Sequence, residues 1–133
     1  MRKQVTGSFD VKLAPMPMPD DIKDAIGRMS LDKQFHGALD ARSRGEMISA
    51  MGGVKGSGAY VAIERVNGTL DGRAGTFVLH HRGIMDRGAQ SLVITVVPDS
   101  GTGELAGLTG TMGIRIETGG KHYYDFDYEI ARE

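Results

Sequence analysis

Residues Leu105 to Ile130 read LAGLTGTMGIRIETGGKHYYDFDYEI and alternate in character over almost their whole length. Apolar or small residues occupy every second position of the first half, which are Leu108, Gly110, Met112, Ile114 and Ile116. The second half does the same with His122, Tyr124, Phe126, Tyr128 and Ile130. A period of two is typical of β-strands, because successive side chains point to opposite faces. The segment therefore predicts an antiparallel hairpin with one aromatic and one charged face.

The register of this hairpin follows from its turn, Thr118-Gly-Gly-Lys121. A tight Gly-Gly reversal pairs Ile116 with His122, and the same register places Met112 opposite Phe126. A sheet that is apolar on only one face is half-buried, so it needs further strands to pack against.

We expect those strands at residues 4–13, 29–35, 39–51, 59–66, 75–82 and 91–97, where apolar and β-branched residues are dense. Asn67-Gly68 and Asp71-Gly72 are predicted turns, and Asp20 to Ile26 a short helix. The run from Ser91 to Val97 is apolar on both parities and is expected to pack on both faces. Eight strands joined by short turns predict an all-β, closed eight-stranded antiparallel barrel with at most one short helix.

Length and composition limit the function classes. A chain of 133 residues is expected to form a single domain, residues 1–133. A net charge of −1 disfavours nucleic acid and anionic membrane surfaces as partners. The sequence has neither an apolar run of transmembrane length nor a signal peptide, and it has no cysteine. These features predict a cytoplasmic protein.

Short motifs for known chemistries are weak. Asp99-Ser100-Gly101 resembles an aspartic protease signature, but Pro98 before it and Thr102 after it fit a plain turn better. Phosphate-loop and nucleophile-elbow patterns are missing. His80 and His81 are adjacent on a predicted strand, so they point to opposite faces and cannot bind one metal together. We expect neither a metal nor an organic cofactor.

Polar residues on two predicted strands form the candidate catalytic site. Tyr60 and Glu64 share one parity, and His81 shares the parity of Phe77 and Leu79 on the next strand. If these faces point inward, Glu64, His81 and Tyr60 form an acid, base and donor cluster, in which burial raises the carboxyl pKa. In the alternative, Val61 and Ile63 point inward and Glu64 is solvated.

Several long motifs support a family resemblance. They are Arg28-Met-Ser-Leu-Asp-Lys-Gln-Phe-His-Gly, Gly58-Ala-Tyr-Val-Ala-Ile-Glu-Arg-Val-Asn-Gly-Thr-Leu-Asp-Gly-Arg, Gly75-Thr-Phe-Val-Leu-His-His, Val96-Val-Pro-Asp-Ser-Gly-Thr-Gly and His122-Tyr-Tyr-Asp-Phe-Asp-Tyr. With these motifs the chain resembles a bacterial family of small proteins of unknown function, placed in the allene oxide cyclase-like barrel superfamily. The resemblance implies a lipocalin-like barrel that assembles into oligomers. Allene oxide cyclases act on an unstable epoxide without a cofactor, but none of their catalytic positions can be matched here.

We expect a barrel cavity that binds a small apolar molecule. Its predicted lining is Phe77, Leu79, Met112, Tyr124, Phe126 and Tyr128. Two alternatives remain open: a cofactor-free cyclase or isomerase that acts on a small hydrophobic substrate, and a structural barrel filled by its own side chains. The apolar run with Val93 and Val97 on the exposed parity predicts a homo-oligomer, with a dimer favoured.

Overall fold

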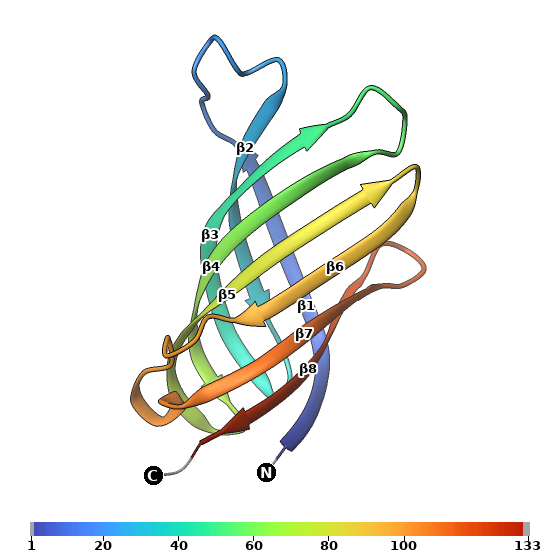
Figure 1. The fold of residues 1–133 in the computed structure, drawn as a ribbon. Helices are drawn as coiled ribbons and strands as arrows, with labels where there is room; N and C mark the ends of the chain where they lie inside the picture. The colour runs from blue at the N-terminus through green and yellow to red at the C-terminus, as the bar shows by residue number, and fades with distance from the viewer. Residues whose placement is uncertain (1, 132–133) are drawn as a thin grey trace.

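Eight antiparallel strands close into one barrel in the computed structural model, which describes residues 2–131 (Figure 1). The strands follow chain order, and β8 pairs back onto β1. Their bounds are β1 Arg2–Pro15, β2 Ile26–Phe35, β3 Leu39–Met51, β4 Gly58–Leu70, β5 Arg73–Asp86, β6 Ala89–Val96, β7 Leu108–Ile116 and β8 His122–Ile130. One 3-10 turn, η1, spans Gly103–Leu105. The predicted fold class is confirmed.

The β7–β8 hairpin has the predicted register. Ile116 pairs with His122, and Met112 pairs with Phe126. Gly119 and Gly120 both have positive φ, at 90° and 81°, which glycine adopts without the steric clash of a Cβ atom. The local alternation and the two glycines are enough to define this hairpin.

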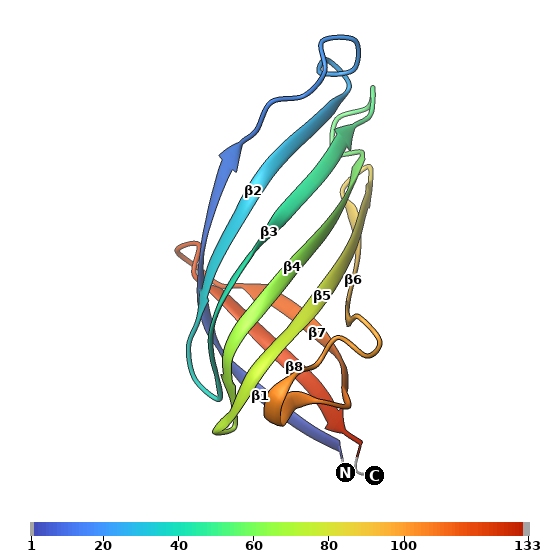
Figure 2. The same ribbon diagram turned by 90° about the vertical axis from the view of Figure 1, so that its left-hand side faces the viewer.

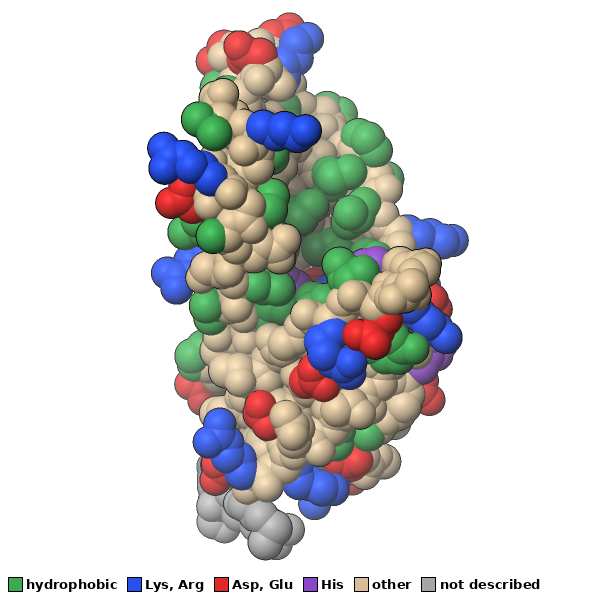
Figure 3. All heavy atoms as spheres, turned by 90° about the vertical axis from the view of Figure 1, so that its right-hand side faces the viewer, with side chains coloured by type: hydrophobic (Ala, Val, Ile, Leu, Met, Phe, Trp, Pro, Cys, Tyr) green, Lys and Arg blue, Asp and Glu red, His purple; other side chains and the backbone are tan. Residues whose placement is uncertain are grey.

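The barrel is fully closed only in its lower half. The β4–β5 ladder runs from Gly58 to Leu70, whereas β6 pairs with β7 only at Ile94 and Thr95. Strands β1 to β6 therefore extend past the β7–β8 hairpin as a curved sheet (Figure 2), and the concave face of this sheet is open on the side that Figure 3 faces. We call this open half the cup, and the end of the barrel at its rim the mouth.

The lower half is filled by the hydrophobic core. Its buried members include Phe35, Leu39, Phe77, Leu79, Met112, Tyr124, Phe126 and Tyr128. The Tyr124 hydroxyl donates to the carbonyl of His36 at 2.8 Å and accepts from the amide of Leu39 at 3.1 Å, so its polar end is satisfied inside the core. Gly7 makes room for this hydroxyl, since a Cβ atom there would lie 2.5 Å from it.

Two local predictions were wrong. Residues 20–25 form turns, because the backbone bonds from Lys23 to Pro19 and from Ile26 to Ile22 are isolated and do not continue as a helix. Asn67 and Gly68 lie inside β4, where a Cβ atom on Gly68 would lie 2.3 Å from the carbonyl oxygen of Asp40. This glycine therefore permits close strand contact instead of a turn. Within residues 2–131, no helix has the length and apolar character needed to cross a membrane.

The prediction for the run from Ser91 to Val97 also needs correction. Ile94 and Val96 are buried, but Leu92 and Val93 are 41% and 40% exposed. Leu92 has the parity of Ile94 and faces the open cup, whereas Val93 faces outward. Both stay exposed because β6 pairs with β7 only at Ile94 and Thr95. This strand is packed on one face at its lower end and on neither face near the mouth. The predicted turn at Asp71-Gly72 does form, since Asp71 and Gly72 both have positive φ, at 51° and 82°.

Candidate functional site

A belt of polar side chains crosses the interior at the boundary between the filled core and the cup. Lys33, Ser43, Glu64 and His81 lie on four adjacent strands, β2 to β5, and each is at most 4% exposed. They are the buried polar side chains among residues 2–131. We call these four residues the polar belt. Burial of four such groups is costly unless they satisfy one another.

Glu64 is the centre of the polar belt. Its Oε2 lies 3.0 Å from Lys33 Nζ, and its Oε1 accepts a hydrogen bond of 2.7 Å from Ser43 Oγ. His81 Nε2 lies 2.5 Å from the same Oε2, but the ring is turned so that Nε2 has no hydrogen-bond partner of good geometry among the described residues. The contact with His81 is therefore a close polar contact and not a well-aligned hydrogen bond.

The surroundings of Glu64 decide its ionisation. Burial by itself raises its pKa, but contacts with His81, the ammonium of Lys33 and the hydroxyl of Ser43 outweigh burial and lower the pKa to about 2. The expectation that burial would raise this pKa was wrong, because it took no account of Lys33 and Ser43. Glu64 is a carboxylate at neutral pH and is not available there as a proton donor.

An ionised Glu64 also fixes the proton on His81. Two acceptor atoms 2.5 Å apart would repel, so His81 Nε2 carries a hydrogen, although the N–H is not well aligned with Oε2. In the neutral ring the other nitrogen, Nδ1, is then the acceptor or base. A carboxylate that orients an imidazole in this way is the arrangement of a general base and its orienting group.

Lys33 reaches the carboxylate between two aromatic rings. Its Nζ lies 5.1 Å from the centroid of Phe9 and 5.7 Å from that of Phe35. Cation–π attraction partly replaces the water that the ammonium loses on burial. The polar belt therefore contains one full ion pair, with its cation held by aromatic groups of the core.

Gly45 allows β3 to approach Glu64. It pairs with Glu64, and a Cβ atom on it would lie 2.0 Å from the carbonyl oxygen of Ile63 and 2.6 Å from Glu64 Cα. A side chain at this position would push the two strands apart. Ser43, which lies on the same strand, would then be moved from the carboxylate it donates to.

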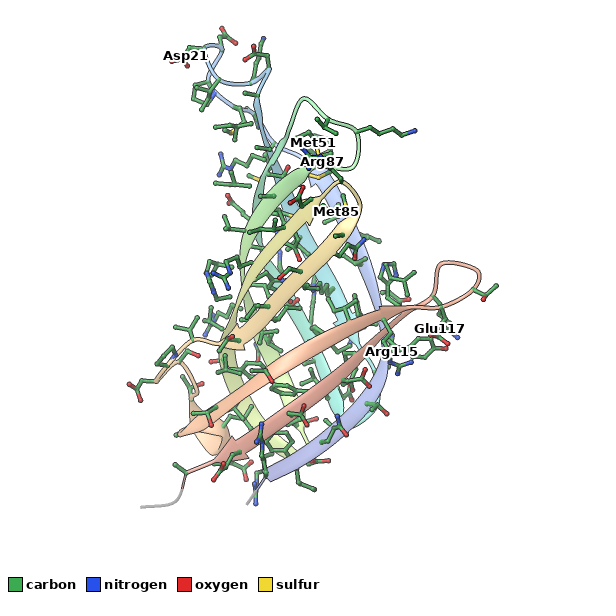
Figure 4. All side chains as sticks on the ribbon, turned by 45° about the vertical axis from the view of Figure 1, so that its right-hand side comes forward. Asp21, Met51, Met85, Arg87, Arg115 and Glu117 are labelled. Atoms are coloured by element: carbon green, nitrogen blue, oxygen red, sulfur yellow. The ribbon has the colours of Figure 1, made fainter. Side chains whose placement is uncertain are left out.

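An apolar pocket lies in the cup on the mouth side of the polar belt, and no residue of the belt is among those that line it. Its volume is about 280 Å³. The lining residues are Met47, Ser49, Met51, Gly58, Ala59, Tyr60, Gly83, Ile84, Met85, Gln90, Ser91 and Leu92. Figure 3 faces the open side and shows hydrophobic side chains gathered around this hollow, and Figure 4 shows Met51 and Met85 at the mouth. Methionines give such a wall an adaptable shape.

Tyr60 connects the pocket with the polar belt. It lines the pocket, and its ring centroid lies 6.3 Å from that of His81. The ring covers Gly83 on the next strand, where a Cβ atom would lie only 2.3 Å from it. Burial, and then the charge of Glu64, raise the pKa of Tyr60, so its hydroxyl keeps its proton and can donate.

The structure brings the three predicted catalytic residues together. Tyr60, Glu64 and His81 all point inward, while Val61 and Ile63 point outward and are 48% and 51% exposed. The alternative parity is therefore excluded. His80 is exposed on the outer face, opposite to His81, as two adjacent strand residues must be. The catalytic role of these residues stays a prediction.

The six residues predicted to line a cavity have a different position. Phe77, Leu79, Met112, Tyr124, Phe126 and Tyr128 are all buried in the core cluster, below the polar belt. None of them is among the residues that line the apolar pocket. They fill the barrel interior below the polar belt. Direct contact of any of them with a ligand stays a prediction.

Sequence reasoning missed Lys33 and Ser43. Lys33 shares its parity with Met29, Leu31 and Phe35, so a lysine on an otherwise apolar strand face was an available signal. Ser43 gave no comparable signal, because it lies among small residues on a strand with weak alternation. The described residues contain no group of three His, Asp or Glu side chains placed to hold a metal ion.

The fold and site define a class: a closed eight-stranded antiparallel barrel with an apolar cup above a buried charged belt. Residues 5–128 match the family described as "Protein of unknown function (DUF3224)", and the chain belongs to that family. The structure is similar to the crystal structure of a protein with unknown function from the DUF3224 family of Shewanella oneidensis MR-1. The two share 52% sequence identity and a TM-score of 0.93, with 100% of each chain covered. No curated protein matches the sequence.

Proposed function

We propose that this protein binds one small, predominantly apolar molecule in the cup, with a polar group of that molecule directed toward the polar belt. The observation that carries the proposal is the position of the apolar pocket on the mouth side of the polar belt, where Tyr60 lines the pocket and lies beside His81. Binding sites typically combine apolar walls with a few polar groups that fix orientation. A volume of about 280 Å³, at roughly 30 Å³ for each water-sized group, suits a ligand of about ten non-hydrogen atoms.

Exposed apolar side chains on the concave face support the proposal. Met51 and Leu92 have the inward parity of their strands and line the pocket, yet they are 67% and 41% exposed. Inward-facing apolar groups that remain in contact with water gain free energy when a ligand covers them, at about 25 cal/mol per Å². The filled lower half shows that the chain can pack its interior with its own side chains, which it does not do in the cup.

The test compares two bulky substitutions at adjacent positions of β3. Ser49 lines the pocket, whereas Ala50 points outward and is exposed. Ser49→Phe fills the cup, and Ala50→Phe is the matched control on the other face. Native mass spectrometry of protein purified from its own host should find a retained apolar ligand on the wild type and on A50F, and not on S49F. Equal occupancy of both variants, or an empty wild type with no thermal shift from any apolar compound tried, would contradict the proposal.

A second candidate function is a cofactor-free isomerase or cyclase, which is favoured by the orientation of His81 by Glu64. A positioned base contributes about 100-fold or more to a rate, and Tyr60 supplies a hydrogen-bond donor from the lining of the pocket. A relation to allene oxide cyclases, as the sequence motifs suggest, would agree with this chemistry. Once a substrate is known, His81→Asn should abolish turnover and retain binding. Turnover at the wild-type rate in H81N would leave only the binding function.

A further inference from the structure

The mouth end of β6 is an open sheet edge. Strand β6 pairs with β5 from Ala89 to Val96, but on its other side it pairs with β7 only at Ile94 and Thr95. Figure 1 shows the β7–β8 hairpin turning away from the rest of β6. In the part of the chain that the structure describes, residues 89–93 therefore have a neighbouring strand on one side only.

The bonds between β6 and β5 show which main-chain groups face the open side. The amide of Val97 donates to the carbonyl of Val78 at 2.8 Å, in the register of the β5–β6 ladder. Bonded and non-bonded pairs alternate in an antiparallel ladder, so every second residue back from Val97 also bonds to β5. Gln90 and Leu92 lie between these residues and direct their main chain to the open edge. Each presents one N–H donor and one C=O acceptor there, at the spacing of an added strand.

This edge lacks the features that keep strand edges from pairing with other chains. Residues 89–93 read Ala-Gln-Ser-Leu-Val, without a charge or a proline. The edge of β7 on the other side of the opening carries Arg115, which is held by Asp125 at 2.7 Å. Charged side chains and proline are the usual protection of an exposed edge. Of the two edges, that of β6 is therefore the one suited to accept a strand.

The open edge also borders the apolar pocket. Gln90 and Leu92 have the inward parity of Ile94, and both line the pocket together with Met85. Figure 3 shows the hollow from its open side. A strand added to the edge would point every second side chain toward the cup, beside Leu92, which is 41% exposed. Because the pocket is apolar, the added strand should carry apolar residues at these alternate positions.

We infer that β6 binds an extended peptide segment of another molecule, antiparallel to residues 89–93, with the main chain of the peptide bonded to Gln90 and Leu92 and its alternate apolar side chains covering the pocket. An antiparallel peptide continues the direction that β7 has beside Ile94. The inference goes beyond the proposed binding of a small molecule, although it uses the same pocket. In this mode of recognition main-chain hydrogen bonds supply affinity, and the pocket selects the side chains.

The probe is a blocked pentapeptide of alternating leucine and threonine, and its binding to the wild-type protein is measured by titration calorimetry. In an antiparallel pair, leucines that point to the cup place their own N–H groups against the edge. N-methylation of the leucine amides should therefore weaken binding by about tenfold or more. N-methylation of the threonine amides, which face away, should leave binding unchanged. Failure of the unmethylated peptide to bind, equal binding of the two methylated peptides, or loss with the threonine set alone overturns the inference.

Two variants of β6 test the same contact from the side of the protein. Leu92→Pro removes an edge donor and leaves the β5 ladder in place, because the N–H of Leu92 faces away from β5. Leu92→Ala is the matched control, which shortens the side chain and keeps the N–H. L92P should bind the peptide about tenfold more weakly than L92A, and equal affinities would overturn the inference. Should L92P not fold, as judged by circular dichroism, the methylated peptides decide the question.

A small probe, p-cresol, separates this inference from the proposed function, because it is within the size that the pocket volume allows and has no peptide main chain. If p-cresol binds and the peptide does not, the pocket stands and the edge assignment fails. If neither binds and S49F behaves like A50F, the binding function itself fails. If light scattering shows that L92P turns a dimer into a monomer while L92A does not, a second copy occupies the edge, and the assignment of a peptide is overturned.

Discussion

Replacement of Glu64 by glutamine removes the only carboxylate among the buried side chains of residues 2–131 and preserves the size of the side chain. Lys33 then keeps its positive charge with no counter-ion inside the barrel, and Ser43 and His81 lose a charged partner. Removal of one partner from a buried ion pair destabilises a protein by roughly 3–5 kcal/mol. This is a large part of a total stability that is typically about 5–15 kcal/mol.

The pKa of Glu64 gives the same order of magnitude. The decrease of this pKa from its ordinary value of 4.5 to about 2 means that the folded state favours the carboxylate by about 3 kcal/mol, at 1.36 kcal/mol per pKa unit. For a chain of 133 residues, a loss of this size lowers the melting temperature by on the order of 10 °C. Urea unfolding at pH 7 should show a lower midpoint for E64Q with an unchanged slope.

The matched control is Glu46→Gln on the neighbouring strand. Glu46 pairs with Arg28 at 2.8 Å, but both side chains are more than a third exposed, so the loss should stay below about 1 kcal/mol. The double variant K33M/E64Q removes both charges and should recover most of the lost stability. If E64Q is no less stable than E46Q, or if the double variant is as unstable as the sum of its two single changes, the account of the polar belt is refuted.

The remaining predictions concern acid stability, strand packing and assembly. Because the pKa of Glu64 is lowered from 4.5 to about 2, its stabilising contribution is complete above pH 4.5 and is lost as the pH falls toward 2. E64Q should therefore lose less stability than the wild type between pH 5 and pH 3 in urea unfolding, and parallel losses would contradict this assignment. Gly45→Ala should destabilise the protein by about 1–3 kcal/mol, because its Cβ atom would clash with the backbone of β4. The control is Gly27→Ala, which should be tolerated because its Cβ atom would meet only Ser49 Oγ, at 3.4 Å. Equal melting temperatures for the two variants would show that the clash at Gly45 is relieved. Light scattering at micromolar concentration should give twice the 14.3 kDa monomer mass, because Val93 and the outward residues Val61 and Ile63 leave apolar surface exposed; a monomer mass would disprove the dimer.

The sequence alone determined the strands and the register of the last hairpin. Both depend on information close together in the chain: a period of two from Leu108 to Ile130, and two glycines at the turn. The same local logic placed His80 and His81 on opposite faces. The prediction of a turn at Asn67-Gly68 failed because glycine occurs both in turns and in strands where two backbones approach closely. Only the approach of the β3 backbone shows that Gly68 belongs to a strand.

The direction of the β4 side chains required the tertiary structure. Both parities carry apolar residues, with Tyr60 and Ala62 on one and Val61 and Ile63 on the other, so periodicity cannot choose between them. Pairing with β3 and β5 makes the choice, since closure of the sheet sends one whole parity into the core.

The chemistry of the site is likewise a product of long-range contacts. Lys33 and Glu64 are 31 residues apart, and Ser43 and Glu64 are 21 apart, so no local pattern joins them. Sequence reasoning placed Glu64 in an apolar interior and predicted a raised pKa, whereas the partners brought by β2 and β3 lower it. The short β6–β7 ladder that opens the cup is also set by how the strands tilt and shift as the barrel closes. Local alternation specifies which residues become strands, but the position of a charge beside its partner depends on the closure of all eight.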